Sequence, residues 1–293
     1  MKLVTYRAEG KERVGALVGE EIVALPYQSV ASVLSLWDAL RPEAIKIAQD
    51  ASTPRIARKD ATLLAPIPRP NKLLCLAGNY SQHIREGGGS VPGKEKMTPR
   101  VFMKPPSNTV IGPGQPVILP KNGNQIDWEC ELGIVIGRAA RFVTEKAAMS
   151  HVAGYTIVND ISERELKIDV DREPRPGDEW FDWLNGKWFD TFAPMGPCVA
   201  TTEEVPDPHA LRLTLKLNGE VKQDASTGQM IFRVPEIVAF ISTLMTLEPG
   251  DVIATGTPAG VGNATDTYLK PGDVMEMEIE KIGAFRTPVK AMA

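Results

Sequence analysis

Two glutamates stand one residue apart in a stretch that otherwise has the composition of a buried strand. Residues 126–137 read IDWECELGIVIG, and the second half is apolar, β-branched and closed by glycine. Side chains at positions i and i+2 of a strand share a face, so Glu129 and Glu131 would point into one space. Two carboxylates held that close repel each other, and burial adds a desolvation cost. The pair therefore requires a shared proton, flanking cations or a bound metal ion.

A third carboxylate favours the metal ion. Asp160 ends a second strand-like run, GYTIVND, where a side chain at a strand end can converge on the glutamate pair. The alternative is an edge strand whose polar face carries two solvated glutamates, which is the usual explanation of an isolated Glu-x-Glu. Three carboxylates without Cys or His suit a hard divalent ion that prefers oxygen ligands, Mg²⁺ or Mn²⁺. We therefore predict a metal site formed by Glu129, Glu131 and Asp160.

His83 is the histidine best placed for acid–base chemistry. It stands three residues before Glu86, in a segment of helical character that follows a short strand and stops at three glycines. On a helical turn the two side chains share a face, and the carboxylate can orient the imidazole and raise its basicity. The alternative is a surface His–Glu pair, which is common on helices. The polar, glycine-rich segment 87–99 has the composition of a lid over a site.

Two further segments carry polar groups beside turns. Lys187 lies between a glycine and an aromatic pair in NGKWFDTF. It either packs its stem and exposes its tip, or presents a cation to an anionic substrate. Thr257 lies in TGTP, after the strand-like DVIA and before AGVG, where glycines allow the backbone to approach a ligand closely. That glycine pattern is neither a P-loop nor a dinucleotide-binding fingerprint.

The elements that must position these residues are mostly strands. Residues 1–25 alternate apolar and polar residues in three short runs, which predicts an antiparallel meander, and residues 29–51 have helical periodicity, with Pro42 opening a second helix. The proline-rich segment 65–71 indicates a linker. We therefore expect a small N-terminal α/β domain over residues 1–70 and a catalytic domain over residues 71–293.

The catalytic domain has many short strand patterns and few helical ones. We predict strands at 72–77, 101–104, 117–119, 132–136, 154–158, 198–201, 211–218, 252–255 and 274–282, and helices at 79–86, 144–150 and 235–245. This pattern is typical of an α+β fold dominated by β-structure, a roll or barrel with a few helices.

Composition limits the class of protein. The 293-residue chain has a net charge of −4 and no basic cluster stands out, so we expect no nucleic-acid partner. No apolar run approaches the length of a membrane span, and the N-terminus MKLVTYRAEG lacks the apolar core of a secretory signal. Cys75, Cys130 and Cys198 lack metal-ligand spacing and are typical of reduced core cysteines. We expect a cytoplasmic protein that does not bind membranes.

The motifs together resemble the fumarylacetoacetate hydrolase (FAH) family. They read GNYSQHIRE, VFMKPPS, IDWECELGIVIG, AGYTIVNDIS, GKWFDTFAPMGP, LNGEVKQ, LEPGDVIATGTPAGVG and LKPGDVMEMEIEKIG. They occur in the family's order and cover roughly residues 70–290. The resemblance implies an FAH-type mixed β-roll or barrel-like catalytic domain, a divalent metal ion, a homodimer and a small N-terminal domain.

The resemblance also implies roles for single residues. The family's metal carboxylates correspond to Glu129, Glu131 and Asp160, and its water-activating pair corresponds to His83 and Glu86. The family's lysine near the metal corresponds to Lys187, and its substrate-contacting threonine corresponds to Thr257. Lys104 and Gln223 correspond to two positions that recurrently line the site.

One motif departs from the family pattern. Where relatives often read D-x-x-x-R-D-x-Q after the metal aspartate, this chain reads DISERELK. Arg164 is kept, and we place it among the substrate-binding residues, while Glu165 and Lys167 replace the acid and the glutamine. We expect the aromatic insertion that follows, residues 168–188, to shape the pocket wall or a dimer contact.

The resemblance implies chemistry on a small 2-oxo or 2,4-diketo acid. We expect hydrolysis of a C–C bond in an acylpyruvate or a fumarylacetoacetate-like substrate, with water activated by His83 and Glu86, oxyanion charge neutralised by Lys187 and the carboxylate held by Thr257. The alternative is a decarboxylase or keto–enol isomerase that acts on oxaloacetate or an unsaturated 2-oxo diacid. A third hypothesis is a non-catalytic protein with a structural ion site, but such a site would need none of His83, Lys187 and Thr257.

Overall fold

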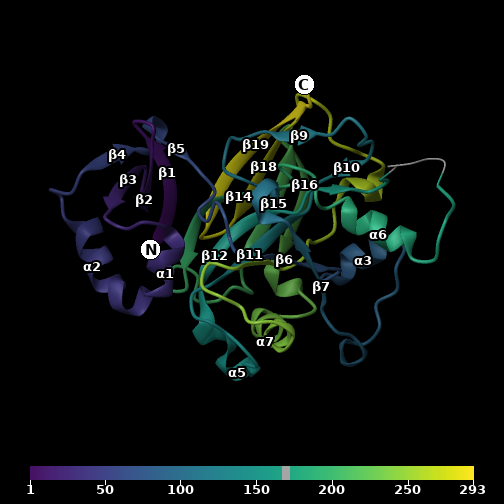
Figure 1. Ribbon diagram of the computed structural model, residues 1–293, viewed down its shortest axis with the longest axis horizontal. Helices are drawn as coiled ribbons and strands as arrows, with labels where there is room; N and C mark the ends of the chain where they lie inside the picture. The colour runs from purple at the N-terminus through teal and green to yellow at the C-terminus, as the bar shows by residue number, and fades with distance from the viewer. Residues whose placement is uncertain (167–171) are drawn as a thin grey trace.

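The computed structural model describes residues 1–166 and 172–293, and most of its regular elements are strands (Figure 1). The strands are β1 Lys2–Ala8, β2 Lys11–Val18, β3 Glu21–Leu25, β4 Arg55–Ala57, β5 Thr62–Leu63, β6 Leu73–Ala77, β7 Arg100–Lys104, β8 Val110–Ile111, β9 Val117–Leu119, β10 Ile126–Asp127, β11 Cys130–Ile136, β12 Val152–Asn159, β13 Ser162–Glu163, β14 Ala193–Thr201, β15 Arg212–Leu217, β16 Glu220–Ser226, β17 Val252–Ala254, β18 Val274–Ile279 and β19 Gly283–Ala291. The α-helices are α1 Val30–Ser35, α2 Trp37–Gln49, α3 Ser81–Glu86, α4 Pro106–Thr109, α5 Glu145–Ala148, α6 Asp178–Asn185 and α7 Val234–Leu244. Short 3₁₀ turns are η1 Arg58–Asp60, η2 Lys94–Lys96, η3 Met149–His151, η4 Thr227–Gln229 and η5 Gly262–Thr265.

The largest sheet passes through the whole molecule. Among the described residues it has twelve strands, in the order β4-β3-β2-β1-β14-β12-β11-β17-β6-β7, with β5 beside β1 and β8 beside β14. Along that order neighbouring strands are antiparallel except β17 and β6, which run parallel. Every residue of β11 and β12 is buried, which explains why their sequences are nearly continuous apolar runs rather than alternating ones.

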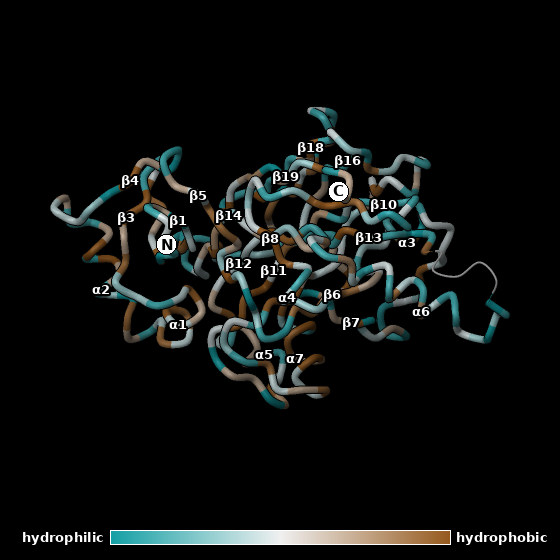
Figure 2. Tube along the Cα trace, turned by 45° about the horizontal axis from the view of Figure 1, so that its top comes forward, coloured by the Kyte–Doolittle hydropathy of each residue, from teal (hydrophilic) through white to brown (hydrophobic). Residues whose placement is uncertain are grey.

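A second sheet packs on the large one and closes the main core. Its strand order is β16-β15-β18-β19-β9. Leu215, Met275 and Met277 of this sheet lie in one hydrophobic cluster with Leu132 and Ile157 of the large sheet. Hydrophobic stretches run through the central strands, whereas the peripheral loops are polar (Figure 2). The predicted α+β fold dominated by β-structure is confirmed.

The N-terminal residues extend the large sheet at one end of the molecule (Figure 1). β1 pairs with β14 through Lys2↔Ala200 and Leu3↔Val199, and the predicted meander of β1, β2 and β3 continues from there. Val33 of α1 lies in a hydrophobic cluster that includes residues of the main sheet. The first seventy residues therefore share a core with the rest, and a domain division at residue 70 stays a prediction.

The break between the two N-terminal helices differs from the predicted one. Ser29 caps α1 by accepting the N–H of Ser32, and the helix ends at Ser35, because the next residue, Leu36, has a φ of −120° and a ψ of 23° outside the helical region. α2 starts at Trp37, so Pro42 lies inside it, on its exposed side. The prediction that Pro42 opens the second helix is wrong, because α2 begins five residues earlier, after Leu36, which provides no side-chain cap that the sequence could have signalled.

Each strand predicted in the catalytic domain overlaps an observed one, but several observed elements were not predicted, and the longest of them are β16, β19 and α6. β16 has the polar sequence EVKQDAS, β19 contains Pro288, and α6 lies within the aromatic insertion. β16 and β19 lack a clear apolar alternation, whereas α6 does carry apolar residues at helical spacing, within a segment that the sequence analysis treated only as an aromatic insertion.

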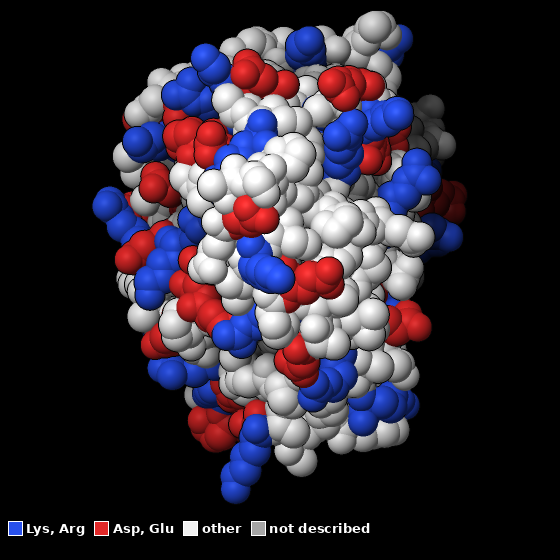
Figure 3. All heavy atoms as spheres, turned by 90° about the vertical axis from the view of Figure 1, so that its left-hand side faces the viewer, with Lys and Arg blue, Asp and Glu red and all other residues white. Residues whose placement is uncertain are grey.

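The surface agrees with the modest net charge. On the end formed by the N-terminal strands, basic and acidic side chains are interspersed (Figure 3). Within residues 1–166 and 172–293, no helix combines the length and the apolar character needed to cross a membrane. The homodimer, the cytoplasmic location and the absence of a nucleic-acid partner stay predictions.

Candidate active site

The pairing of β11 with β12 brings the three carboxylates together. Cys130 lies opposite Asn159, and the Asp160 amide donates to the Glu129 carbonyl at 2.9 Å, so the residues just outside the two strands also face each other. Glu131 follows on the same face of β11. One ligand oxygen of each carboxylate lies within 4.8 Å of the other two, so the predicted convergence is present.

These carboxylates lie in the interior. Glu129, Glu131 and Asp160 expose 5%, 0% and 1% of their surface. β11 lies between β12 and β17, which makes it a central strand. The alternative of an edge strand with solvated glutamates is therefore wrong.

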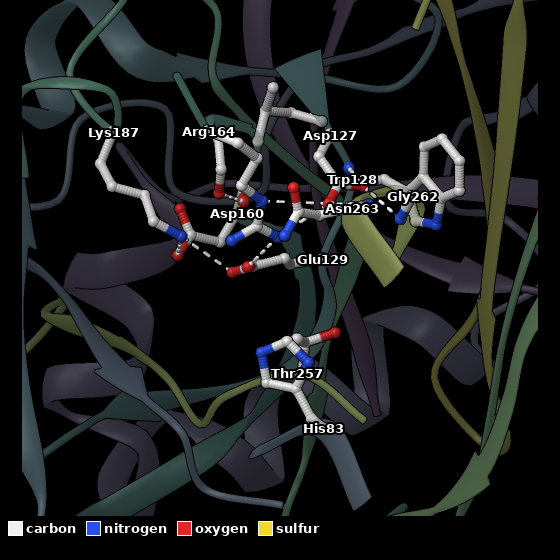
Figure 4. Close-up of polar contacts among 12 residues, drawn as sticks. His83, Asp127, Trp128, Glu129, Asp160, Arg164, Lys187, Thr257, Gly262 and Asn263 are labelled. Atoms are coloured by element: carbon white, nitrogen blue, oxygen red, sulfur yellow. Dashed lines mark hydrogen bonds and ion pairs between the residues drawn. The ribbon is translucent and has the colours of Figure 1, made fainter. Parts of the chain in front are cut away.

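Two buried lysines neutralise much of this negative charge. Lys187 Nζ donates to Glu129 Oε2 at 2.9 Å and to Asp160 Oδ2 at 2.8 Å (Figure 4). Lys104 Nζ donates to Asp160 Oδ1 at 2.5 Å and to the Ile161 carbonyl at 2.8 Å. Such partners are needed because an unpaired ion in the interior is strongly destabilising.

Arg164 and Asp127 tie the carboxylates to the loop at residues 260–263. Arg164 Nη2 donates to Glu129 Oε1 at 2.5 Å, and its Nε donates to Asp127 at 3.0 Å. Asp127 also accepts the backbone N–H groups of Gly262 at 2.6 Å and Asn263 at 2.9 Å (Figure 4). The sequence predictions did not include Asp127, although it continues the alternation Asp-x-Glu-x-Glu and could have been found by that signal.

The environment shifts the two glutamates in opposite directions. Burial opposes the ionisation of Glu129, but Lys187 and Arg164 outweigh it and hold the pKa of Glu129 below its usual value. Burial raises the pKa of Glu131 well above its usual value, and the charges of Asp160 and Glu129 raise it further. Although burial opposes its charged form, Asp160 and Glu129 raise the pKa of Lys187.

Glu131 has a carboxylate oxygen with no partner among the described residues. Its Oε2 accepts the N–H of Gly256 at 2.6 Å, whereas its buried Oε1 makes no hydrogen bond. Among the described residues, four buried carboxylates face the two buried lysines and the largely buried Arg164, because Asp127 adds to the predicted three carboxylates. One negative charge of this described cluster therefore stays uncompensated when all its members are ionised. An oxygen-only donor set with an orphaned oxygen and excess negative charge fits a divalent cation such as Mg²⁺ or Mn²⁺.

His83 and Glu86 form the predicted pair on α3. His83 Nδ1 lies 2.8 Å from Glu86 Oε1, and Glu86 Oε2 accepts the N–H of Gly260 at 2.8 Å, which fixes α3 against the loop after β17. His83, Thr257 and Glu129 line the same cavity, and the imidazole lies across an open space from Glu129 (Figure 4). Because a carboxylate only accepts hydrogen bonds, Nδ1 carries the proton of a neutral His83 and Nε2 is left as the free acceptor.

Two glycines of the TGTPAGVG motif are required by the backbone. Gly256 has a φ of +91°, and a Cβ there would lie 2.7 Å from the Asn79 Cβ. Gly260 has a φ of +102°, and a Cβ there would lie 2.0 Å from the Lys222 carbonyl oxygen. Their N–H groups bind Glu131 and Glu86 respectively, so the motif connects the carboxylates to the histidine helix.

Thr257 lines the cavity, whereas Gln223 and Lys104 are not among its lining residues. Gln223 Nε2 donates to Thr257 Oγ1 at 2.8 Å, and Gln223 Oε1 accepts the N–H of Cys130 at 3.0 Å. Gln223 therefore supports Thr257 from behind, and Lys104 supports Asp160. Direct contact of Gln223 or Lys104 with a substrate stays a prediction.

A cavity of about 720 Å³ opens above Glu129, a volume typical of small-molecule sites. Trp180 and Trp183 of α6 line it, and Trp183 packs edge-on against Phe102 with ring centroids 5.0 Å apart. The prediction that the aromatic insertion shapes the pocket wall is confirmed for these residues, while residues 167–171, including Lys167, lie outside the described part of the chain.

The predicted lid, residues 87–99, is largely exposed and contains η2. Lys94 Nζ lies 2.6 Å from Glu236 Oε1 in the first turn of α7, so an ion pair links the segment to the body of the protein. Gly87 is the residue of this segment that lines the cavity. Movement of the segment over a ligand stays a prediction.

Comparison with known proteins gives consistent matches. Residues 72–290 match the family model described as fumarylacetoacetate (FAA) hydrolase, C-terminal. The oxaloacetate tautomerase FAHD2A, mitochondrial, of Bos taurus is 41% identical over 232 residues, which cover 78% of this chain and 70% of the relative. A crystal structure of maleylpyruvate hydrolase from Sphingobium sp. SYK-6 in complex with manganese(II) and pyruvate matches with a TM-score of 0.80 at 28% identity, covering 100% of both chains. A crystal structure of 2-hydroxyhepta-2,4-diene-1,7-dioate isomerase from Mycobacterium marinum matches with a TM-score of 0.77 at 30% identity, covering 100% of this chain and 99% of the other.

Proposed function

Because this chain belongs to the fumarylacetoacetate hydrolase family, as its sequence motifs and fold indicate, we propose that it is a divalent-metal-dependent enzyme that interconverts the keto and enol forms of a 2-oxo acid. Members of the family include hydrolases, isomerases and tautomerases. The observation that carries the proposal is the position of the His83–Glu86 pair across the cavity from Glu129. The relative named oxaloacetate tautomerase supports this choice of reaction.

Glu129, Glu131 and Asp160 are the residues that would hold the metal ion. Bound there, Mg²⁺ or Mn²⁺ would supply a Lewis acid that polarises a 2-oxo group and thereby acidifies the neighbouring C3. The manganese in the related maleylpyruvate hydrolase structure supports this ion class.

His83 is the group that moves the proton. Glu86 accepts from Nδ1 and fixes the ring, so Nε2 points its lone pair away from the carboxylate and can take a proton from C3 of the substrate and return it. Because Glu86 is itself held by the N–H of Gly260, the base has a fixed orientation before the substrate binds. A base held in this way needs no rearrangement during the reaction.

Lys187 stabilises the negative charge that develops on the 2-oxo oxygen. An ammonium group has three N–H donors, and Lys187 gives two of them to Glu129 and Asp160. Its third donor remains for the substrate, and its charge is maintained because the two carboxylates raise its pKa. Thr257 lines the same cavity and would contact the substrate carboxylate.

Hydrolysis of a C–C bond in an acylpyruvate is the second candidate, and the cavity favours it. A volume of about 720 Å³ with the aromatic side chains of α6 on one side leaves room for an acyl group beyond the 2-oxo acid. In that reaction His83 would take the proton from water instead of from C3. The related maleylpyruvate hydrolase supports this candidate.

Isotope exchange distinguishes the candidates. The protein, supplied with Mn²⁺, is mixed in D₂O with oxaloacetate, a panel of acylpyruvates and unsaturated 2-oxo diacids, and products are identified by mass. Faster keto–enol conversion with deuterium at C3 is the expected result, and His83→Ala should slow it by roughly 10²–10⁴-fold. His151→Ala, which changes a histidine of η3 outside the cavity, is the matched control.

Other products would change the assignment. Pyruvate together with a carboxylic acid would identify the hydrolase, and carbon dioxide would identify a decarboxylase. No conversion of any of these acids would overturn both candidates.

A further inference from the structure

Arg100 is a cation of the cavity whose charge has no partner in the described parts of the chain. Three of the residues that line the cavity are cationic, and two of them are paired: Lys187 binds Glu129 and Asp160, and Arg164 binds Asp127 and Glu129. The backbone of Arg100 pairs with Ala77 of β6, while its exposed guanidinium makes no ion pair or hydrogen bond within residues 1–166 and 172–293. A free guanidinium at the mouth of a cavity is a ready partner for a carboxylate.

Strand β7 aligns Arg100 with the buried end of the site. Side chains alternate along a strand, so Arg100, Phe102 and Lys104 share one face. Lys104 reaches Asp160 at 2.5 Å, and the Phe102 ring lies 5.3 Å from Lys187 Nζ. One face of a single strand therefore runs from the carboxylate cluster, past an aromatic ring, to an unpaired cation.

We infer that Arg100 is a specificity-determining residue: its guanidinium binds a second carboxylate at the far end of the substrate, so that this chain discriminates a 2-oxo diacid from the 2-oxo monoacid of equal length. The inference rests on the proposed function, because the 2-oxo end must occupy the site near Glu129. It assigns to Arg100 a specificity role that involves no proton transfer. The rings of Phe102 and Trp183 would pack against the carbon atoms between the two ends.

The position of Arg100 guides the choice of probe. Arg100 and Lys104 lie four residues apart, roughly 13 Å along the strand at about 3.3 Å per residue. Arg100 is therefore at the opposite end of β7 from the residue that contacts Asp160, and we test it with diacids longer than four carbons.

Binding measurements test this without depending on turnover. The probes are 2-oxoheptanedioate and 2-oxoheptanoate, which have the same chain length and differ by one terminal carboxylate, titrated calorimetrically into the Mn²⁺-supplied protein. The wild type should bind the diacid about tenfold more tightly, because a charge-assisted hydrogen bond at a partly exposed site contributes at the lower end of its range. Arg100→Met should remove this preference and leave the affinity for the monoacid unchanged, and Arg100→Lys should restore part of it.

Arg85→Met is the matched control, because Arg85 is an exposed arginine of the neighbouring helix α3 that lines a different pocket. It should keep the preference for the diacid. Equal binding of both acids by the wild type, or a diacid preference that survives Arg100→Met, would overturn the role of Arg100 while the proposed function stands. Binding of neither acid would overturn the proposed function and this inference with it.

Discussion

The floor and the wall of the cavity are built in opposite ways. We define the floor as Glu129, which lines the cavity, together with Glu131, Asp160 and the cations that pair with these carboxylates beneath it; the register of two central strands fixes this cluster. The wall consists of α3, α6 and the outer end of β7, whose cavity-lining side chains include the partly exposed His83 and the exposed Trp180 and Arg100. Charge in the floor is therefore linked to the stability of the fold, whereas the wall can change without disturbing the core.

Removing a cation from the floor should have the largest effect. Lys187→Met leaves Glu129 and Asp160 facing each other in the interior without their shared partner. Breaking a buried ion pair in this way costs about 3–5 kcal/mol, so the free energy of unfolding should fall by that amount in urea titration. Lys94→Met is the matched control, since the same substitution removes an exposed ion pair to Glu236 and should cost less than about 1 kcal/mol. Equal losses in the two variants would contradict the distinction between floor and wall.

Removing the base from the wall should change the rate and leave the stability unchanged. His83→Ala should lower kcat by roughly 10²–10⁴-fold, because the proton acceptor is lost. The free energy of unfolding should change by no more than about 0.5 kcal/mol, as expected of a partly exposed side chain outside the core. Paired kinetic and urea measurements check both values. A variant that fails to fold would show that α3, like the carboxylate cluster of the floor, is required for the stability of the fold.

Asp127 lies between the two regions, and its replacement should have an intermediate effect. Asp127→Asn keeps the shape but removes the negative charge that holds Arg164 and the N–H groups of Gly262 and Asn263. We expect a loss of about 1–3 kcal/mol in the free energy of unfolding. Asp224→Asn, which changes an exposed carboxylate paired with Arg212, is the control and should have little effect on thermal unfolding. A loss as small as that of the control would show that the loop is held by other contacts.

The smallest expected effect concerns His209, which binds the start of α7, the helix that the Lys94–Glu236 ion pair links to the predicted lid. His209 Nε2 accepts the N–H of Val234 at the start of α7, and burial and the charge of Arg233 lower the pKa of His209, with Asp207 and Glu236 opposing. The unfolded chain therefore takes up the proton first, near pH 6.5, as pH falls. The stability contributed by neutral His209 is present above that pH and is lost as pH falls through the lower folded pKa.

Comparison of the wild type with His209→Gln isolates this contribution. The difference between the unfolding free energies of the two proteins should shrink between about pH 7 and pH 5. A difference that stays constant over this range would show that His209 has the same pKa in the folded and the unfolded chain.

Much of the floor could be predicted because strand geometry is local. The i, i+2 spacing of Glu129 and Glu131 placed both on one face, and a strand end at Asp160 placed the third carboxylate nearby. The pairing of His83 with Glu86 follows in the same way from helical spacing. Both inferences need only the repeat of one regular element.

The wall could not be predicted to the same extent, because it depends on contacts between distant segments. The role of Asp127 requires the loop at Gly262, and the lack of a partner for Arg100 within residues 1–166 and 172–293 is visible only when its neighbours are placed. α6 has apolar residues at helical spacing, but the sequence does not show which surface they face, and Trp183 takes its position from packing against Phe102 of β7. Local propensity carries little information where tertiary contacts decide.

The parallel pairing of β6 with β17 determines when the histidine helix can take its place during synthesis. The strand that leads into α3 is completed early in translation, but Asn79 after that strand binds the Thr255 carbonyl, 176 residues further along the chain. At about 5–20 residues per second, the ribosome needs roughly 10–35 seconds to make that interval. β11 and β12, which are joined by a much shorter connection, can pair in the meantime, since nearby segments close with less loss of entropy. His83 is therefore synthesised before the carboxylates it faces and is positioned after them.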